Sequence, residues 1–125
     1  MESNMVGWFE VPVIDLERAK KFYEAVFDIA ISVHDLDGLR MGWFPSAPGK
    51  SGAMGSLVQH GSYIPSDSKG PVLYFSCKDL SLELGRVEGA GGTVLQAKKE
   101  IGEGHGFMAL LKDTEGNRIA LHSQL

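Results

Sequence analysis

Near the start of the chain, a short run of apolar and aromatic residues is followed by apolar positions at a helical spacing. The run occupies residues 8–14 and ends at Asp15, whose carboxylate suits a helix start because it can accept hydrogen bonds from free backbone amides. Apolar residues then recur every three or four positions and form one stripe, with charged residues on the other face. The stripe contains Leu16, Ala19, Phe22, Tyr23 and Val26. The pattern predicts a strand followed by an amphipathic helix.

The same succession of patterns returns half a chain later. Residues 72–78 are largely apolar and lead into Asp79, as the first run leads into Asp15. A second apolar stripe follows, and Gly91 ends it because glycine readily adopts the left-handed geometry of a helix end. This stripe contains Leu80, Leu84, Val87 and Ala90. We therefore expect a strand and a helix in each half.

Each predicted helix is followed by short apolar stretches separated by turn residues, a pattern typical of antiparallel strands. The stretches are 29–33, 39–44 and 54–59 in the first half, and 93–96, 107–111 and 118–122 in the second. The predicted class is α+β, with a βαβββ module at about 6–60, a surface linker at about 60–71 and a second module at about 72–123. Paired in this way, the modules would form a curved, cup-like mixed sheet around a cavity, with the helices outside.

Composition narrows the class of protein. The chain has 125 residues, with 12 Lys and Arg against 16 Asp and Glu, and the net charge of −4 argues against nucleic acid as the main partner. Cys77 is the sole cysteine, so no intrachain disulfide is expected. The first residues do not resemble a signal peptide, and no apolar stretch is long enough to span a membrane. We expect a single cytoplasmic domain.

Two segments resemble a known superfamily. Residues 8–27 contain Trp-Phe-Glu-Val-Pro-Val, then Asp-Leu and a Phe-Tyr pair, and they are similar to the opening of the vicinal oxygen chelate superfamily. The tail at 113–121 resembles its closing hairpin. The superfamily includes glyoxalase I, bleomycin-resistance proteins, fosfomycin-resistance proteins and extradiol dioxygenases, and the small glyoxalase-related proteins are most alike. The resemblance implies paired βαβββ modules more strongly than any one reaction, because this fold hosts many chemistries.

The resemblance also implies four positions for metal ligands. Metal-dependent members place a His, Gln or Glu on each of four strands, and the matching positions here are Trp8, Val72, Ala120 and a residue within 55–58. Indole, isopropyl and methyl groups cannot hold a divalent ion. We therefore expect the standard metal site to be absent and no cofactor to be needed, although a divalent metal at a displaced site stays open.

Polar residues one pleat further along these strands offer a different chemistry. Glu10 lies two residues beyond Trp8, and His122 lies two beyond Ala120, so each shares a strand face with a ligand position. Together, a carboxylate and an imidazole would suit general acid–base catalysis. The alternatives are a carboxylate bound to backbone amides or an arginine, a hydrogen-bonded surface histidine, and a displaced metal site.

Other side chains are candidates for ligand binding. Trp8, Trp43 and Phe75 lie on predicted strands, where inward-facing rings would stack on a flat or apolar molecule, although some must belong to the core. Gln59 ends a strand of the first module. His105 lies in a glycine-rich loop that could close over a cavity mouth or be solvated.

Three functions remain open at this point. A glyoxalase-related lyase or isomerase would use Glu10 and His122 for proton transfer to or from a small metabolite. A metal-free protein of the bleomycin-resistance type would instead bind a drug or metabolite between its aromatic side chains. An inert relative would fill the cavity with its own side chains. We expect a homodimer, because related folds complete their curved sheets across an interface.

Overall fold

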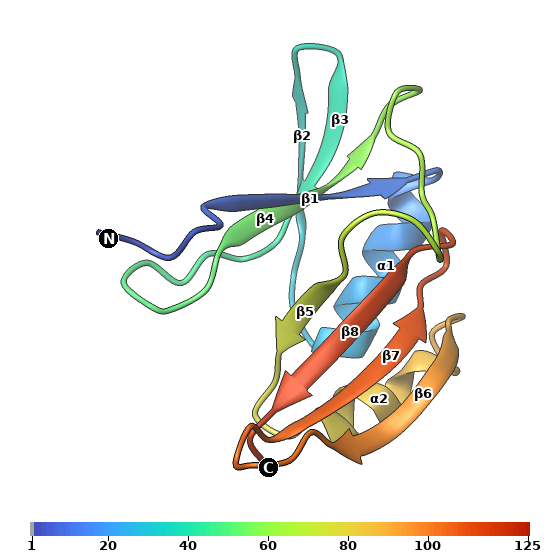
Figure 1. Ribbon diagram of the computed structural model, residues 1–125. Coiled ribbons are helices and arrows are strands. Elements are labelled where there is room, and N and C mark those ends of the chain that lie inside the picture. Colours follow the sequence, from blue (N-terminus) through green and yellow to red (C-terminus); the bar gives the residue numbers. More distant parts are fainter. Residues whose placement is uncertain (1) are drawn as a thin grey trace.

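The computed structural model describes residues 2–125 and contains two βαβββ modules (Figure 1). The first module comprises β1 (Trp8–Val13), α1 (Leu16–Phe27), β2 (Ser32–Leu36), β3 (Leu39–Trp43) and β4 (Met54–Gln59). The second comprises β5 (Leu73–Ser76), α2 (Leu80–Val87), β6 (Thr93–Glu100), β7 (Phe107–Lys112) and β8 (Arg118–Ser123). The predicted α+β class and the repeated module are confirmed.

The two modules have the same strand order. The first sheet runs β1-β4-β3-β2 and the second β5-β8-β7-β6. In each, the first strand of the module pairs in parallel with the last, and the other neighbours are antiparallel. The modules are therefore duplicates in topology as well as in sequence pattern.

The sheets are two separate layers rather than one continuous sheet. Within residues 2–125, no strand of the first sheet is hydrogen-bonded to a strand of the second. Figure 1 shows the sheets at a steep angle to one another, with both helices behind the β5–β8 sheet. Contacts between α1 and α2 join the modules. The cup-like combination of both sheets therefore stays a prediction.

The helices begin where the sequence predicts. The Asp15 carboxylate accepts a hydrogen bond from the Arg18 amide at 3.2 Å, and that of Asp79 accepts one from the Ser81 amide at 3.0 Å. The stripe predicted for α1 is fully buried. Helix α2 ends at Val87, however, so the prediction that it reaches Ala90 is wrong. Residues 88–90 continue as turns, with the Ala90 amide donating to the carbonyls of Arg86 and Val87.

Two strands differ from their predicted ranges by three residues or more: β2 runs Ser32–Leu36 rather than 29–33, and β6 runs Thr93–Glu100 rather than 93–96. Strand β2 begins at Ser32 because Ile31 belongs to the core and its amide donates to the Glu24 carboxylate on α1 at 2.8 Å. This contact holds the chain against the helix before it can extend. Strand β6 continues to Glu100, beyond the predicted 93–96, because irregularities in its register let it follow β7 along its whole length.

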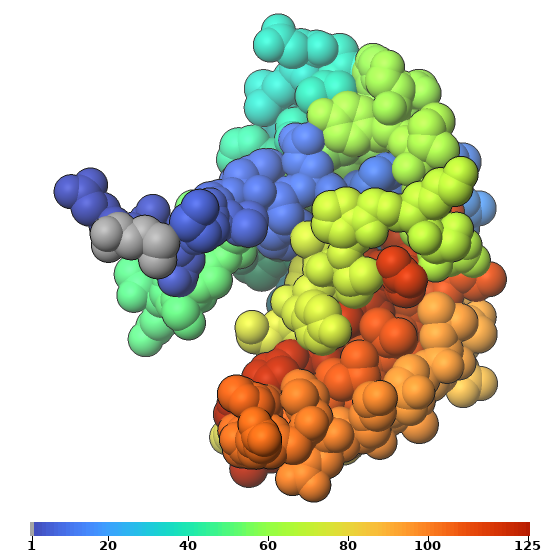
Figure 2. All heavy atoms as spheres, viewed as in Figure 1, coloured from blue at the N-terminus to red at the C-terminus, as the bar shows by residue number. Residues whose placement is uncertain are grey.

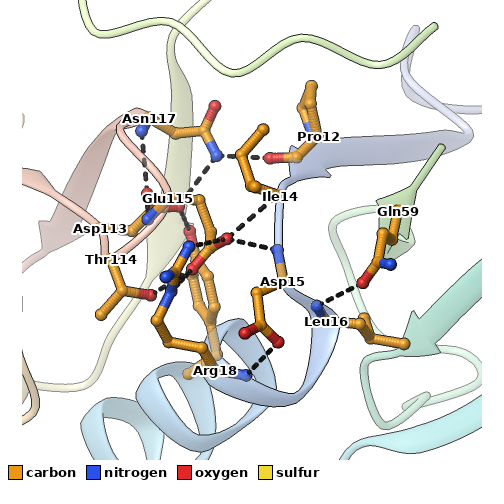
Figure 3. A network of polar contacts seen from close by, with 11 residues as sticks. Pro12, Ile14, Asp15, Leu16, Arg18, Gln59, Asp113, Thr114, Glu115 and Asn117 are labelled. Carbon is orange, nitrogen blue, oxygen red and sulfur yellow. Dashed lines mark hydrogen bonds and ion pairs between the residues drawn. The ribbon is translucent and has the colours of Figure 1, made fainter. Parts of the chain in front are cut away.

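A polar network joins the β7–β8 hairpin to the start of α1 (Figure 3). The Glu115 carboxylate accepts hydrogen bonds from the amides of Ile14 and Asp15 at 2.9 and 2.8 Å, and from the Arg18 guanidinium. Nearby, the Asn117 side-chain amide donates to the Pro12 carbonyl at 2.7 Å. The hairpin of the second module thus satisfies backbone groups of the first.

This network changes the ionisation of its members. Burial opposes the ionisation of Glu115, but the hydrogen bonds from Arg18, Thr114 and the two backbone amides outweigh it and lower the pKa of this carboxyl group. Beneath it, the Tyr23 hydroxyl donates to Asp113 at 2.6 Å. Burial, reinforced by the Asp113 charge, raises the pKa of Tyr23 well above its usual value. The hairpin therefore holds the modules together through a charged, buried contact.

Candidate functional site

Each sheet has one face toward the helices and one turned away, which we call the outer face. In β4, Gly55, Leu57 and Gln59 point toward the helices: Phe9 covers Gly55, Leu57 lies in the core, and the Gln59 side chain contacts α1. Side chains alternate along a strand, so their neighbours lie on the outer face. Strand register extends this outer face across the first sheet to Trp8, Glu10, Pro12, His34, Met41, Trp43, Met54, Ser56 and Val58.

Three aromatic rings form a row on this outer face. The Trp8 and Trp43 rings meet edge to face, with centroids 5.9 Å apart. On the other side of Trp43, the His34 ring lies with its centroid 4.2 Å away. The three rings belong to β1, β3 and β2. The row also crosses β4, which lies between β1 and β3. Ser56 of β4 lies within this span and is fully buried.

Two buried polar atoms of this outer face have no hydrogen-bond partner among the described residues. They are Ser56 Oγ and Trp43 Nε1; Glu83 Oε1 on α2 is a third such atom elsewhere. Leaving a buried donor or acceptor unsatisfied costs about 1–3 kcal/mol. Natural structures contain few such groups, and each calls for an explanation such as an unseen partner.

Glu10 lies beside this row and is held by the linker. It is the register partner of Ser56 on β4, and its carboxylate accepts a hydrogen bond from the Tyr63 hydroxyl at 2.8 Å. This hydrogen bond to the carboxylate raises the pKa of Tyr63. The linker is anchored further along by the Arg118 amide, which donates to the Ser66 carbonyl at 3.2 Å.

A groove of about 490 Å³ lies between β1, the linker and the beginning of β8. We call it the β1 groove, and its lining includes Trp8, Glu10, Pro12, Ile64, Lys69 and Arg118. Figure 2 shows linker atoms lying against those of β1 on this side of the molecule. Its volume is within the range of about 300–1,000 Å³ typical of small-molecule sites. Apolar surface with a few charged groups at its margin suits an organic ligand.

His122 lies on the outer face of the other sheet. It pairs in register with Ser76 of β5 and Met108 of β7. Its Nε2 donates to the backbone carbonyl of His105 at 2.7 Å. Among the described residues, no hydrogen bond or ion pair joins His122 to Glu10, which is bound by Tyr63 instead. Their catalytic roles stay predictions.

The remaining predicted ligand-binding residues, Gln59, Phe75 and His105, do not lie together. The Gln59 side-chain oxygen accepts the Leu16 amide at 2.7 Å and so caps α1. Phe75 faces the helices and packs among the rings of Phe9, Phe27 and Phe44. The His105 carbonyl is the acceptor for His122, and its side chain is exposed. Of the predicted binding residues, Trp8 and Trp43 are in mutual contact, and Trp8 shares the β1 groove with Glu10.

Sequence reasoning missed three residues that complete this region. Ser56 falls in a segment considered only for metal ligands, Tyr63 lies in the linker, and His34 lies near a predicted turn. Alternation along 54–59 could have placed Ser56 on one face with Met54. Nothing in the sequence reveals which strands flank it. Cys77 offers no alternative nucleophile, because burial, with the Glu83 carboxylate nearby, raises its thiol pKa to about 12.

The chain belongs to the Glyoxalase/Bleomycin resistance protein/Dioxygenase superfamily, whose model matches residues 5–121. The predicted superfamily is therefore confirmed. No curated protein matches the sequence.

Several solved structures have the same fold. A glyoxalase/bleomycin resistance protein from Albidiferax ferrireducens T118 is 21% identical, with 94% of this chain and 97% of that chain covered and a TM-score of 0.72. TnmS3, an antibiotic binding protein from Streptomyces sp. CB03234, is 23% identical over 98% of both chains, with a TM-score of 0.67. A glyoxalase-related enzyme from Fulvimarina pelagi is 15% identical over 96% of this chain and 88% of that chain, with a TM-score of 0.70. At these identities the likeness shows the fold alone.

The side chains at the superfamily's ligand positions do not fit a divalent ion. Trp8 packs its ring on Trp43, Ala120 presents a buried methyl group, and the outer face of the 55–58 segment offers a serine and a valine. Such groups lack the imidazole and carboxylate donors that divalent metals prefer. Across residues 2–125, no three His, Cys, Asp or Glu side chains gather as a metal site. In that same range, no helix is long and apolar enough to cross a membrane.

Proposed function

We propose that this protein binds a small, partly aromatic organic molecule in the β1 groove, against Trp8. The observation that carries the proposal is the groove itself, because a cavity of about 490 Å³ places an indole, a carboxylate and two cationic side chains around one space. Stacking on an exposed indole would supply most of the affinity, and the charged groups at the margin would orient the ligand. The fold shared with TnmS3, which is described as an antibiotic binding protein, supports this reading.

The aromatic anion 8-anilinonaphthalene-1-sulfonate tests this function, because its naphthalene suits Trp8 and its sulfonate suits Lys69 and Arg118. Its fluorescence should rise on binding the wild-type protein, and W8A should weaken the affinity at least about tenfold, as expected for loss of a stacking partner. The control is L82A, which removes an apolar side chain from α2 that is more exposed than Trp8, at 60% against 41%. Equal binding by W8A and wild type would place the probe elsewhere.

We also propose that two copies of the chain associate through their outer faces. Large apolar side chains are exposed there, including Trp8 at 41% and Tyr74 at 54%. Isolated exposed apolar residues need no explanation, but Trp8 with Met54 (45% exposed) on the first sheet and Tyr74 on the second favour a covered interface. Sedimentation equilibrium should give a dimer mass, and Y74E should shift the equilibrium toward monomer. A monomeric wild-type protein at high micromolar concentration would contradict the proposal.

An enzymatic function by proton transfer is the second candidate. It is favoured by the placement of Glu10 and His122 on outer faces, where both stay accessible to a ligand rather than serving the core. Because they lie on different sheets, this function would need the second copy to bring them together. In that case neither E10Q nor H122N alone would be active. Mixing the two variants would restore activity, because in the mixed dimer one site combines Glu10 of the H122N chain with His122 of the E10Q chain.

A further inference from the structure

The unpartnered atoms Ser56 Oγ and Trp43 Nε1 belong to residues that lie side by side on neighbouring strands of the first sheet. Trp43 and Ser56 are register partners on β3 and β4, and Ser56 and Glu10 are register partners on β4 and β1. Three polar side chains from three strands therefore share one level of the outer face. Two of them have no hydrogen-bond partner among the described residues, and the third accepts from Tyr63.

Trp8 connects these polar side chains to the β1 groove. Its ring meets Trp43 on one side and lines the groove on the other. The residue is 41% exposed, so part of it faces solvent rather than protein. Exposed side chains change rotamer on a picosecond to nanosecond timescale. If Trp8 turns toward solvent, the groove extends over β4 to Ser56 and Trp43.

The three polar groups define what they would bind. The indole N–H of Trp43 can only donate, the Glu10 carboxylate can only accept, and the Ser56 hydroxyl can do both. A hydrocarbon would leave Trp43 and Ser56 unsatisfied. A simple cation could contact Glu10 and the Ser56 oxygen but would leave the indole N–H of Trp43 unsatisfied. A hydroxyl or carbonyl oxygen on the edge of a flat ring would satisfy the indole and the serine while the ring stacks on the tryptophans.

We propose that Ser56 and Trp43 fix the bound molecule, and that its class is a planar aromatic bearing hydroxyl or carbonyl oxygens. The proposal rests on the proposed binding function and names its ligand chemistry. Trp8 acts as a movable cover: it shields the two atoms in the empty protein and becomes a stacking partner in the complex.

The test compares 2-naphthol with 2-methylnaphthalene, which differ mainly by a hydroxyl in place of a methyl group. We expect the wild-type protein to prefer 2-naphthol by about tenfold in calorimetric or ligand-observed NMR titrations, the size expected for hydrogen bonds to otherwise unsatisfied groups. In S56A the preference should fall to about twofold or less, chiefly through weaker binding of 2-naphthol. W43F, which keeps a ring but removes the N–H, should reduce the preference in the same way.

Two controls separate ligand fixation from a structural role. S32A removes a hydroxyl from the same level of the outer face, but Ser32 Oγ already has a partner in His34 Nε2 at 3.0 Å, so the preference should be unchanged. The unliganded S56A protein should melt at or above the wild-type temperature, because the substitution removes a buried, unsatisfied hydroxyl.

The possible failures are distinguishable. If wild type binds both probes equally, the small-molecule function survives and the assignment of Ser56 and Trp43 is overturned. A preference retained in both folded variants, S56A and W43F, also overturns it. If wild type binds neither probe, nor 8-anilinonaphthalene-1-sulfonate, the proposed function itself fails.

Discussion

The Trp8 and Trp43 rings meet edge to face, with their planes 76° apart and centroids separated by 5.9 Å. Because these are the two tryptophans of the chain, their coupling can be observed directly. We predict an exciton couplet in the circular dichroism of the indole bands. W8F and W43F should each abolish it without loss of secondary structure. A couplet that survives either substitution would contradict this geometry.

A second prediction concerns the acid stability of the contact between modules. The folded pKa of Glu115 is lowered, so its contribution is fully present above the unfolded value of about 4.3 and is lost as the pH falls through the lower folded value. Its side chain is fully buried beside Arg18. E115Q should therefore lower the free energy of unfolding at pH 7 by about 2–3 kcal/mol. It should also flatten the dependence of stability on pH below about 4.3.

Urea denaturation between pH 7 and pH 3 measures both effects. The matched control is E17Q on α1, because Glu17 pairs with Arg40 at 2.9 Å while remaining largely exposed. Such surface pairs are worth at most about 1 kcal/mol. Equal losses in E17Q and E115Q would show that the buried network has no special role.

The loop that His122 contacts gives a third prediction. Gly106 has φ +85°, and an added Cβ would collide with the Ser123 carbonyl oxygen and lie 3.2 Å from His122 Nε2. Gly104 has a similar φ of +77° but open space around it. G104A should cost about 1 kcal/mol from backbone strain alone, and G106A should cost at least about twice that because backbone atoms must also move. Thermal unfolding measures the difference, and equal costs would contradict the packing at Gly106.

The absence of a required metal is a fourth prediction. A metal that binds the folded state raises the melting temperature by an amount set by its concentration relative to its dissociation constant. After treatment with a chelator, we expect no shift on adding Zn²⁺, Mn²⁺ or Ni²⁺, and no metal retained after dialysis. A metal-dependent shift that disappears in E10Q and H122N would instead establish a displaced metal site.

The helix α1 shows what the sequence could predict. Its start at Asp15 and its buried stripe follow from local spacing, because the 3.6-residue period and the capping carboxylate act within a few residues. The contact between Trp8 and Trp43 could not be read in this way. It requires β4 to lie between β1 and β3, and that order arises from packing between distant segments.

Glu115 also shows that local sequence patterns do not reveal contacts between distant segments. The hairpin that residues 113–121 resemble is present, but the residues that Glu115 contacts, Ile14 and Asp15, lie at the other end of the chain. Turn chemistry is local, whereas the use of a turn residue as a cap for a distant helix depends on how the modules dock. The contact between Glu10 and Tyr63 of the linker could not be predicted either, because it too depends on how distant segments pack.

Chemical-shift mapping with 2-naphthol locates the bound molecule on the protein. We predict that the Trp8 and Trp43 indole N–H resonances and the backbone amides of β1 and residues 63–64 shift on titration, while the amide of Leu82 on α2 stays in place. Shifts concentrated instead around Phe27 and Phe75, where a smaller pocket lies between the modules, would contradict it, as would the absence of any saturable shift.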